Sequence, residues 1–227
     1  MNEQMQDNRR SVWTWLFNPF HYVAGGRALA AGLVLMAVTS ALAMLSHTHF
    51  DGVLDLHPGA PAPWWVFWIE SPIDWLTLAL VLLAGGKLLS KSHIRIIDVL
   101  GTQALARFPA VLAAAIQLPP QVQDANRKML AALMQGMRPG SPGLSSIQPV
   151  DMLLFTFMGI ISTVVIIWMI YLMYRAFAVA CNVSGAKAII AFVVLLLLAE
   201  ILSKFILGGL LAFCMSHGYV VPAEFHL

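Results

Sequence analysis

Five long apolar runs, separated by short polar segments, dominate the pattern of hydrophobic and polar positions along the chain. A helix needs about 20 mostly apolar residues to cross the hydrocarbon core of a bilayer, and each run comes close to that length. The third run is the least regular, because it contains Arg95, Asp98 and Arg107. The pattern predicts an all-α integral membrane bundle of five transmembrane helices. These helices should cover about residues 28–46, 72–89, 94–118, 151–174 and 188–213.

The first 27 residues differ from the membrane domain, residues 28–227, in being rich in aromatic and polar side chains. The stretch "SVWTWLFNPFHYV", residues 11–23, carries Trp, Phe and Tyr, which concentrate at membrane–water interfaces. Its Asn18-Pro19 pair is a signal for the end or the start of a helix. We expect an interfacial segment here that lies on the inner leaflet.

A second amphipathic segment, about residues 120–138, lies between the third and fourth runs. Its apolar residues Leu130, Leu133, Met134 and Met137 recur at the i, i+3, i+4, i+7 spacing of one helix face. Such a helix either covers the bundle at the outer leaflet or binds a partner.

The distribution of basic residues predicts the orientation, because short cytoplasmic loops carry an excess of Lys and Arg. With the N-terminus in the cytosol, eight basic residues lie inside: Arg9, Arg10, Arg27, Lys87, Lys91, Arg95, Arg175 and Lys187. Three lie outside: Arg127, Lys128 and Arg138. We therefore expect a cytosolic N-terminus and an external C-terminus. The first run is longer than a signal-peptide core, so we expect it to remain as a membrane span.

Composition narrows the function classes. Charged residues make up 11% of the chain and hydrophobic ones 59%, whereas soluble domains carry about 25% charged residues. The sequence contains no cluster of Lys and Arg residues of the kind that binds nucleic acid. Cys181 and Cys214 provide neither a disulfide framework nor metal-ligand spacing. Phosphate-binding, serine-hydrolase and zinc-protease motifs do not occur in the sequence, so we expect no enzyme and no cofactor.

Charged residues inside the apolar runs are the main candidates for a working site, because such groups usually face the bundle interior and pair there. In "FVVLLLLAEILSKFILGGLL", Glu200 and Lys204 are four residues apart and share one helix face. Arg107 lies at a similar depth in the third run, so we expect it as a second partner of Glu200. Two cations and one anion suit a structural ion network, a pocket for an anionic group such as a lipid phosphate, or a proton or ion path. Asp98, near the inner surface, should pair with Arg95.

The sequence "HTHFDGVLDLH" places a second cluster in the first outer loop. His47, His49, Asp51 and His57, with Asp55 between them, are residue types that bind zinc. The cluster is either a solvated loop or a weak metal-binding or pH-sensing site.

The stretch "LMYRAFAVACNVSGAKAIIAFVVLLLLAEIL", residues 172–202, resembles the Yip family of multi-spanning membrane proteins, named for interaction with Ypt/Rab GTPases. "LFNPF" before the first run and Pro109 within the third also resemble that family. The resemblance implies a five-helix bundle with a cytosolic N-terminus. The short N-terminal region is similar to that of bacterial members, which implies the bacterial cytoplasmic (inner) membrane.

Together these features predict a non-enzymatic protein that organises the membrane or binds a protein partner or an anionic lipid. The alternative is a small transporter or channel subunit that uses Arg107, Glu200 and Lys204. A protein that senses metal through its outer loop is a third class.

Overall fold

The computed structural model describes residues 12–59, 62–137 and 143–217. Within these residues, five helical segments are long and apolar enough to cross a membrane, which confirms the predicted all-α membrane bundle. Arg9, Arg10 and Arg138, which contribute to the predicted orientation, lie outside the described residues.

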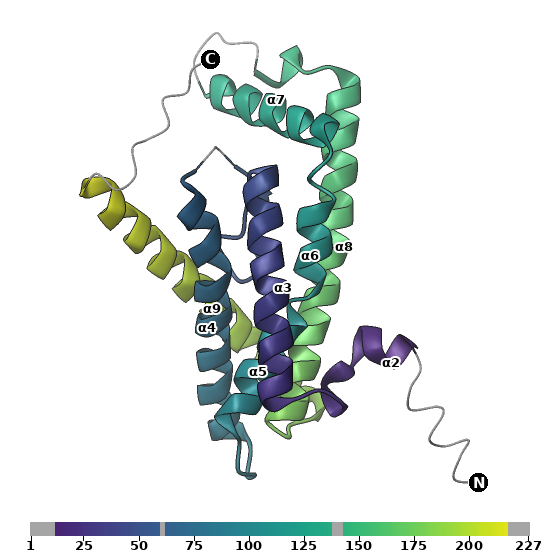
Figure 1. Cartoon of the computed structure of the whole chain (residues 1–227), viewed down its shortest axis with the longest axis vertical. Helices are drawn as coiled ribbons and strands as arrows, with labels where there is room; N and C mark the ends of the chain where they lie inside the picture. Colours follow the sequence, from purple (N-terminus) through teal and green to yellow (C-terminus); the bar gives the residue numbers. More distant parts are fainter. Residues whose placement is uncertain (1–11, 60–61, 138–142, 218–227) are drawn as a thin grey trace.

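The elements follow one another in an up-and-down order along the bundle (Figure 1). The N-terminal part contains α2 (Val12–Phe17), the 3-10 turn η2 (Pro19–His21), α3 (Gly25–Ser46), and a short antiparallel pair, β1 (Thr48–His49) and β2 (His57–Pro58). The middle contains α4 (Trp64–Leu89), α5 (Ile96–Ala106), α6 (Pro109–Ala115) and α7 (Pro120–Gly136). The last part contains the 3-10 turn η3 (Gly143–Ser146), α8 (Pro149–Ala180) and α9 (Gly185–Ser216).

Helix α4 begins eight residues before the start that we predicted for the second span. Its first turns include Trp64 and Trp68, and Pro72 lies inside the helix without ending it. Membrane helices tolerate proline because neighbouring groups satisfy the freed backbone and no water competes for it. Asp74 consequently lies ten residues into the helix, about 15 Å along its axis.

The third span is a broken helix. Helix α5 ends at Ala106 and α6 begins at Pro109, so that Arg107 and Phe108 form the junction. Pro109 has no N–H to donate to the carbonyl of Leu105, and the N–H of Phe108 bonds that carbonyl instead, at 3.1 Å. The break places the Arg107 side chain at the point where the span changes from one helix to the next.

Small residues bring α3 and α5 into close contact. A Cβ atom added to Gly32 would overlap the backbone of Ala104, and one added to Gly101 would overlap the carbonyl oxygen of Gly25. Ala28 is fully buried on the same face of α3. Close packing of small residues is a common way for membrane helices to associate, and here it joins spans within one chain.

The aromatic N-terminal segment packs against α8. The indole N–H of Trp168 donates to the carbonyl of Leu16 at 3.0 Å, and the Phe17 ring contacts Trp168 and Tyr171. Trp13 and Trp15 on α2 are exposed, so their rings are available to a bilayer interface.

Helix α7 crosses one end of the bundle, at the top of Figure 1, and we refer to this end as the α7 end. The face that it buries against the bundle consists of Val122, Ala125, Asn126, Met129 and Ala132. Asn126 donates to Gln117, which in turn donates to Ser162 on α8.

The apolar residues that predicted α7 are therefore not its buried face. Leu133, Met134 and Met137 are exposed, because small residues such as Ala125 and Ala132 make the contact with the bundle.

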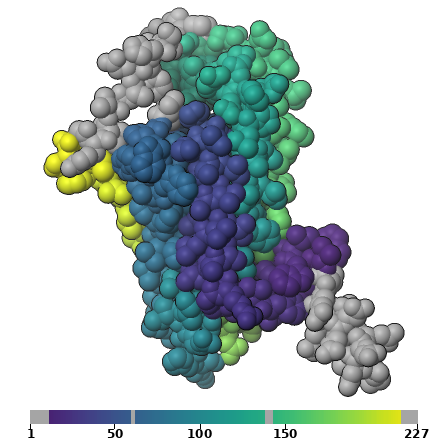
Figure 2. Space-filling view, in the orientation of Figure 1, coloured from purple at the N-terminus to yellow at the C-terminus, as the bar shows by residue number. Residues whose placement is uncertain are grey.

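Helix α9 leans away from the other spans. Its C-terminal part projects from the side of the bundle in the space-filling view (Figure 2). Only one stripe of α9 is buried, formed by Ala188, Phe192, Leu196, Ala199, Ser203 and Leu207. This stripe packs mainly on α4, and the contact between these two helices contains the candidate site.

Candidate functional site: a polar layer between α4, α5 and α9

A group of ionisable side chains lies where α4, the α5–α6 junction and α9 meet. We refer to it as the polar layer. Its members are Asp74 on α4, Arg107 at the junction, Glu200, Ser203 and Lys204 on α9, and Asp55 of the loop between β1 and β2, which contacts Lys204.

Asp74 and Arg107 form the most deeply buried pair of the layer. Asp74 is 0% exposed and Arg107 4%, and Nη2 of Arg107 lies 3.7 Å from Oδ2 of Asp74. That distance is an ion-pair contact but exceeds a hydrogen bond. Among the described residues, neither Asp74 carboxylate oxygen nor Nη1 of Arg107 has a hydrogen-bond partner, although the Ser203 side chain lies beside Asp74. The pair is neutral in sum but incompletely satisfied.

Glu200 anchors the loop of residues 47–63, which enters from the α7 end. Its Oε2 accepts the backbone N–H of Leu54 at 2.8 Å. A Cβ atom added to Gly52 would lie 2.5 Å from Oε1 of Glu200, so a larger residue at this position would displace the Glu200 carboxylate. The loop thus reaches the middle of α9 rather than staying at the end of the bundle.

Lys204 on α9 forms a second connection between the loop and the helix. Its ammonium group contacts the Asp55 carboxylate and lies 3.6 Å from Oε1 of Glu200. The Lys204 side chain is 43% exposed, so the protein covers it only in part, whereas it covers Asp74 completely.

The predicted Glu200–Lys204 pair is present, at 3.6 Å, but the partner of Arg107 differs from the prediction. Arg107 pairs with Asp74 instead of Glu200, although Glu200 is near enough to both to interact electrostatically. The prediction placed Asp74 at the edge of its span, because it started that span at Pro72. The earlier start of α4 moves Asp74 into the helix, where it is the nearest anion to Arg107.

Two acidic residues that we had not counted change the net formal charge of the layer from positive to negative. We had counted two cations, Arg107 and Lys204, against Glu200 alone. With Asp74 and Asp55 included, three carboxylates face two cations. The layer therefore carries a formal surplus of negative charge, which favours a cation as its ligand over an anion.

The predicted inner pair lies apart from the layer. Nε of Arg95 is 3.7 Å from Oδ2 of Asp98 at the start of α5, and the Arg95 side chain is 69% exposed. An exposed pair of this kind contributes little to stability.

The structure only partly assembles the four residues that we predicted as the outer metal cluster. The His49 ring stacks on the His57 ring, with centroids 5.9 Å apart, but its Nδ1 is engaged by Glu70. His49 packs on the Phe67 ring and lies 2.7 Å from Oε1 of Glu70, whose Oε2 accepts the N–H of Phe50. His47 follows α3 in a left-handed conformation and lines a separate hollow that also includes Arg127. The β1–β2 pairing places His49 opposite His57, whereas His47 ends α3 and lies before β1.

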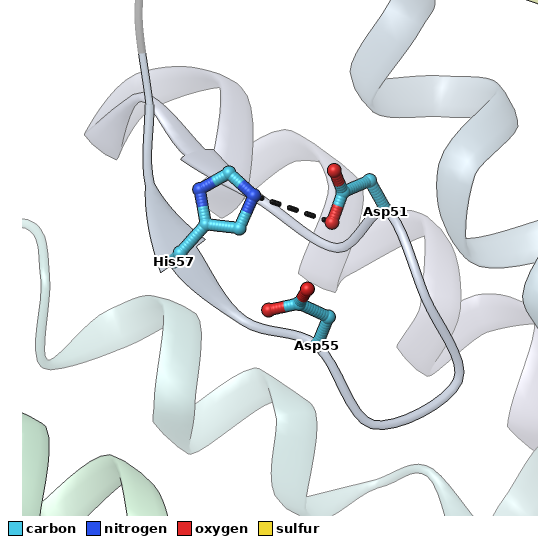
Figure 3. Close-up of side chains that lie close together, drawn as sticks. All are labelled: Asp51, Asp55 and His57. Carbon is cyan, nitrogen blue, oxygen red and sulfur yellow. Dashed lines mark ion pairs between the residues drawn. The ribbon is translucent and has the colours of Figure 1, made fainter. Parts of the chain in front are cut away.

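Asp51 and His57 remain together, and Asp55 joins them (Figure 3). Nε2 of His57 lies 3.2 Å from Oδ1 of Asp51. This contact raises the pKa of His57 to about 9, against the opposing effect of burial, and the contact with His57 lowers the pKa of Asp51.

No protein-family model, curated protein or solved structure matches the chain. Membership of the Yip family therefore stays a prediction.

Proposed function

We propose that this multi-pass membrane protein is a small transporter or channel subunit that passes a proton or a small cation through the polar layer. The observation that carries the proposal is the buried Asp74–Arg107 pair at the break of the third span, with hydrogen-bonding capacity left unused. The proposal assigns the protein no enzymatic activity.

Three properties of the layer support this function. Charged groups inside a membrane are expensive, so proteins keep them mainly along substrate and ion pathways or in proton relays. Broken helices at membrane depth often surround the binding sites of transporters. The surplus of carboxylates in the layer is the charge that a cation pathway needs.

The layer also connects a buried group to an exposed one. Asp74 interacts with Glu200, Glu200 with Lys204, and Lys204 with Asp55 at the surface of the loop. The exposed fraction of the side chain is 0% at Asp74, 17% at Glu200, 43% at Lys204 and 35% at Asp55. A proton or cation entering from the α7 end would therefore meet the loop first and Asp74 last.

The decisive experiment is a flux assay with the purified protein in liposomes. A proton gradient or a potassium diffusion potential is applied, and a trapped pH-sensitive or cation-sensitive dye reports the flux. We expect flux above that of empty liposomes for the wild type, and its loss in Asp74→Asn.

The matched control is Asp98→Asn, which makes the same chemical change outside the layer and should keep the flux. Size-exclusion chromatography and circular dichroism establish that both variants fold. Wild-type flux equal to that of empty liposomes, or equal flux in Asp74→Asn and the wild type, would refute the proposal.

A membrane-organising protein of the Yip type is the second candidate, supported by the N-terminal segment. Helix α2 is attached to α8 while Trp13 and Trp15 remain exposed at one end of the bundle. This arrangement suits a wedge in the inner leaflet of a bacterial cytoplasmic membrane, with the N-terminus in the cytosol. Trp13→Ala/Trp15→Ala should then reduce the effect of the protein on vesicle shape, while flux stays unchanged. Identical vesicle shapes with the variant and the wild type would exclude this candidate.

A further inference from the structure

The loop between β1 and β2 carries three potential metal ligands on one side. The carboxylate oxygens of Asp51 and Asp55 and a ring nitrogen of His57 all lie within 4.8 Å of one another. Figure 3 shows the two carboxylates and the imidazole turned toward the same space. Their side chains are between 35% and 44% exposed, so an ion in solution can reach them.

Hydrogen bonds to two helices fix the backbone of this loop. Glu70 on α4 accepts the N–H of Phe50, and Glu200 on α9 accepts the N–H of Leu54. The β1–β2 pairing places His57 opposite His49. The loop that carries the three ligands is therefore fastened to two transmembrane helices, unlike a freely solvated loop.

One ligand atom in the cluster is incompletely satisfied. Oδ1 of Asp51 is buried and, among the described residues, has no hydrogen bond of standard geometry, although it faces His57 at 3.2 Å. A buried carboxylate oxygen without a hydrogen bond is unfavourable unless a cation or a donor compensates it.

A cation already lies at the edge of this cluster. The ammonium group of Lys204 contacts Asp55, the third ligand. A metal ion that binds Asp55 would compete with Lys204, and Glu200 lies 3.6 Å from the ammonium group to receive it.

We propose that Asp51, Asp55 and His57 form a binding site for a divalent transition-metal ion. Two carboxylates and one neutral imidazole are oxygen and nitrogen ligands of the kind that bind Zn²⁺, and a water molecule would complete a tetrahedral site. Binding would displace the proton that His57 shares with Asp51, so metal affinity should rise with pH. The site lies at the end of the polar layer, so bound metal would release Lys204 from Asp55. The site stands on the geometry of the loop and does not depend on ion flux through the protein.

The test is direct metal binding to the chelator-stripped, detergent-purified protein. Co²⁺ is titrated and followed by its visible absorption, and Zn²⁺ is then added in competition. We expect one site per chain, with affinity reduced at least about tenfold in Asp55→Asn and in His57→Gln. Lys204→Gln should bind more tightly than the wild type, because the competing cation is gone.

His47→Gln is the matched control, since His47 lies in the same loop but outside the cluster. It should bind Co²⁺ like the wild type. Equal binding by His57→Gln and the wild type, or an equal loss in His47→Gln and His57→Gln, would overturn the proposal.

Asp74→Asn separates this proposal from the proposed transport. That variant should lose flux and still bind Co²⁺, because Asp74 takes no part in the cluster. Loss of Co²⁺ binding in the correctly folded Asp74→Asn protein would contradict a site formed by Asp51, Asp55 and His57.

Discussion

The two main helix contacts of this bundle differ in their content of ionisable side chains. Helices α3 and α5 meet through small residues, with Gly32 against Ala104 and Gly101 against Gly25. Helices α4 and α9 also approach closely, at Gly85 and Leu195, but they meet in addition across a layer of ionisable and hydroxyl side chains that includes Asp74. The first contact has no space for a side chain at Gly32 or Gly101, whereas the second contains Asp74 oxygens without a hydrogen bond among the described residues.

This difference suggests which helices are rigid and which can move. A close-packed interface resists movement, because any displacement creates a cavity or an overlap. A layer of partly satisfied charges has several arrangements of similar energy, particularly beside a broken helix. We therefore expect α3 and α5 to stay fixed while α9 and the α5–α6 junction move.

The largest effect should come from removing one charge of the buried pair. Arg107→Ala leaves the Asp74 carboxylate uncompensated and should lower the free energy of unfolding by about 3–5 kcal/mol. The double variant Asp74→Asn/Arg107→Gln should be more stable than Arg107→Ala. Chemical unfolding in detergent measures both, and a wild-type unfolding curve for Arg107→Ala would contradict the pairing.

The close-packed contact should be nearly as sensitive to a single methyl group. Gly32→Ala introduces a Cβ that overlaps the Ala104 backbone and should cost about 1–3 kcal/mol. Gly208→Ala is the matched control, because a Cβ there meets no atom within 4 Å among the described residues. Equal unfolding temperatures for the two variants would show that α3 and α5 do not pack as described.

The anchoring of the loop should be lost with a smaller effect on overall stability. Glu200→Gln weakens the acceptor of the Leu54 N–H and should cost about 1 kcal/mol, with faster hydrogen exchange at that amide. Glu70→Gln should instead accelerate exchange at Phe50. If each variant accelerated both amides equally, the two carboxylates would not act as separate anchors.

The His57–Asp51 contact predicts a modest pH dependence of the metal-free protein. The folded-state pKa of His57 is raised from 6.5 to about 9. The stabilisation is therefore complete below about pH 6.5 and disappears as the pH rises through about 9. Unfolding temperatures measured in chelator should fall across this window, and the fall should be smaller in His57→Gln. A wild-type profile that stays flat between these pH values would argue against the contact.

The smallest effect belongs to the exposed pair outside the layer. Asp98→Asn should change the free energy of unfolding by less than about 1 kcal/mol, because Arg95 is mostly exposed and solvent screens the charge. A loss as large as that of Arg107→Ala would mean that burial does not decide the importance of these charges.

Hydropathy was sufficient to predict the fold, because bilayer thickness ties the length of an apolar run to a membrane span. It also identified Glu200, Lys204 and Arg107 as the charges inside those runs. The partners of these charges could not be predicted, because pairing depends on which helices are neighbours and on where each helix begins.

Asp74 is the residue of the layer that the sequence pattern did not identify. Reading Pro72 as the start of a span placed Asp74 at the membrane edge and removed it from consideration. The spacing of Glu70 and Asp74, four residues apart beside a Trp-rich helix start, was the available signal that both belong to one helix face. The members of the proposed metal site could likewise not be selected from the sequence, because Glu70 of α4 engages His49 and this contact depends on how the loop packs on α4.

The central claim is that water and ions reach the α4–α9 contact while the α3–α5 side of the bundle stays dry. Ser203 and Ser40 allow a matched test, because both are buried serines in membrane-spanning helices, one in the polar layer and one on α3. Each is replaced by cysteine in a Cys181→Ala/Cys214→Ala background and treated, in native membranes, with a charged thiol reagent. We predict that Ser203→Cys reacts and Ser40→Cys does not. Protection of both cysteines, or equal labelling of both, would contradict the account.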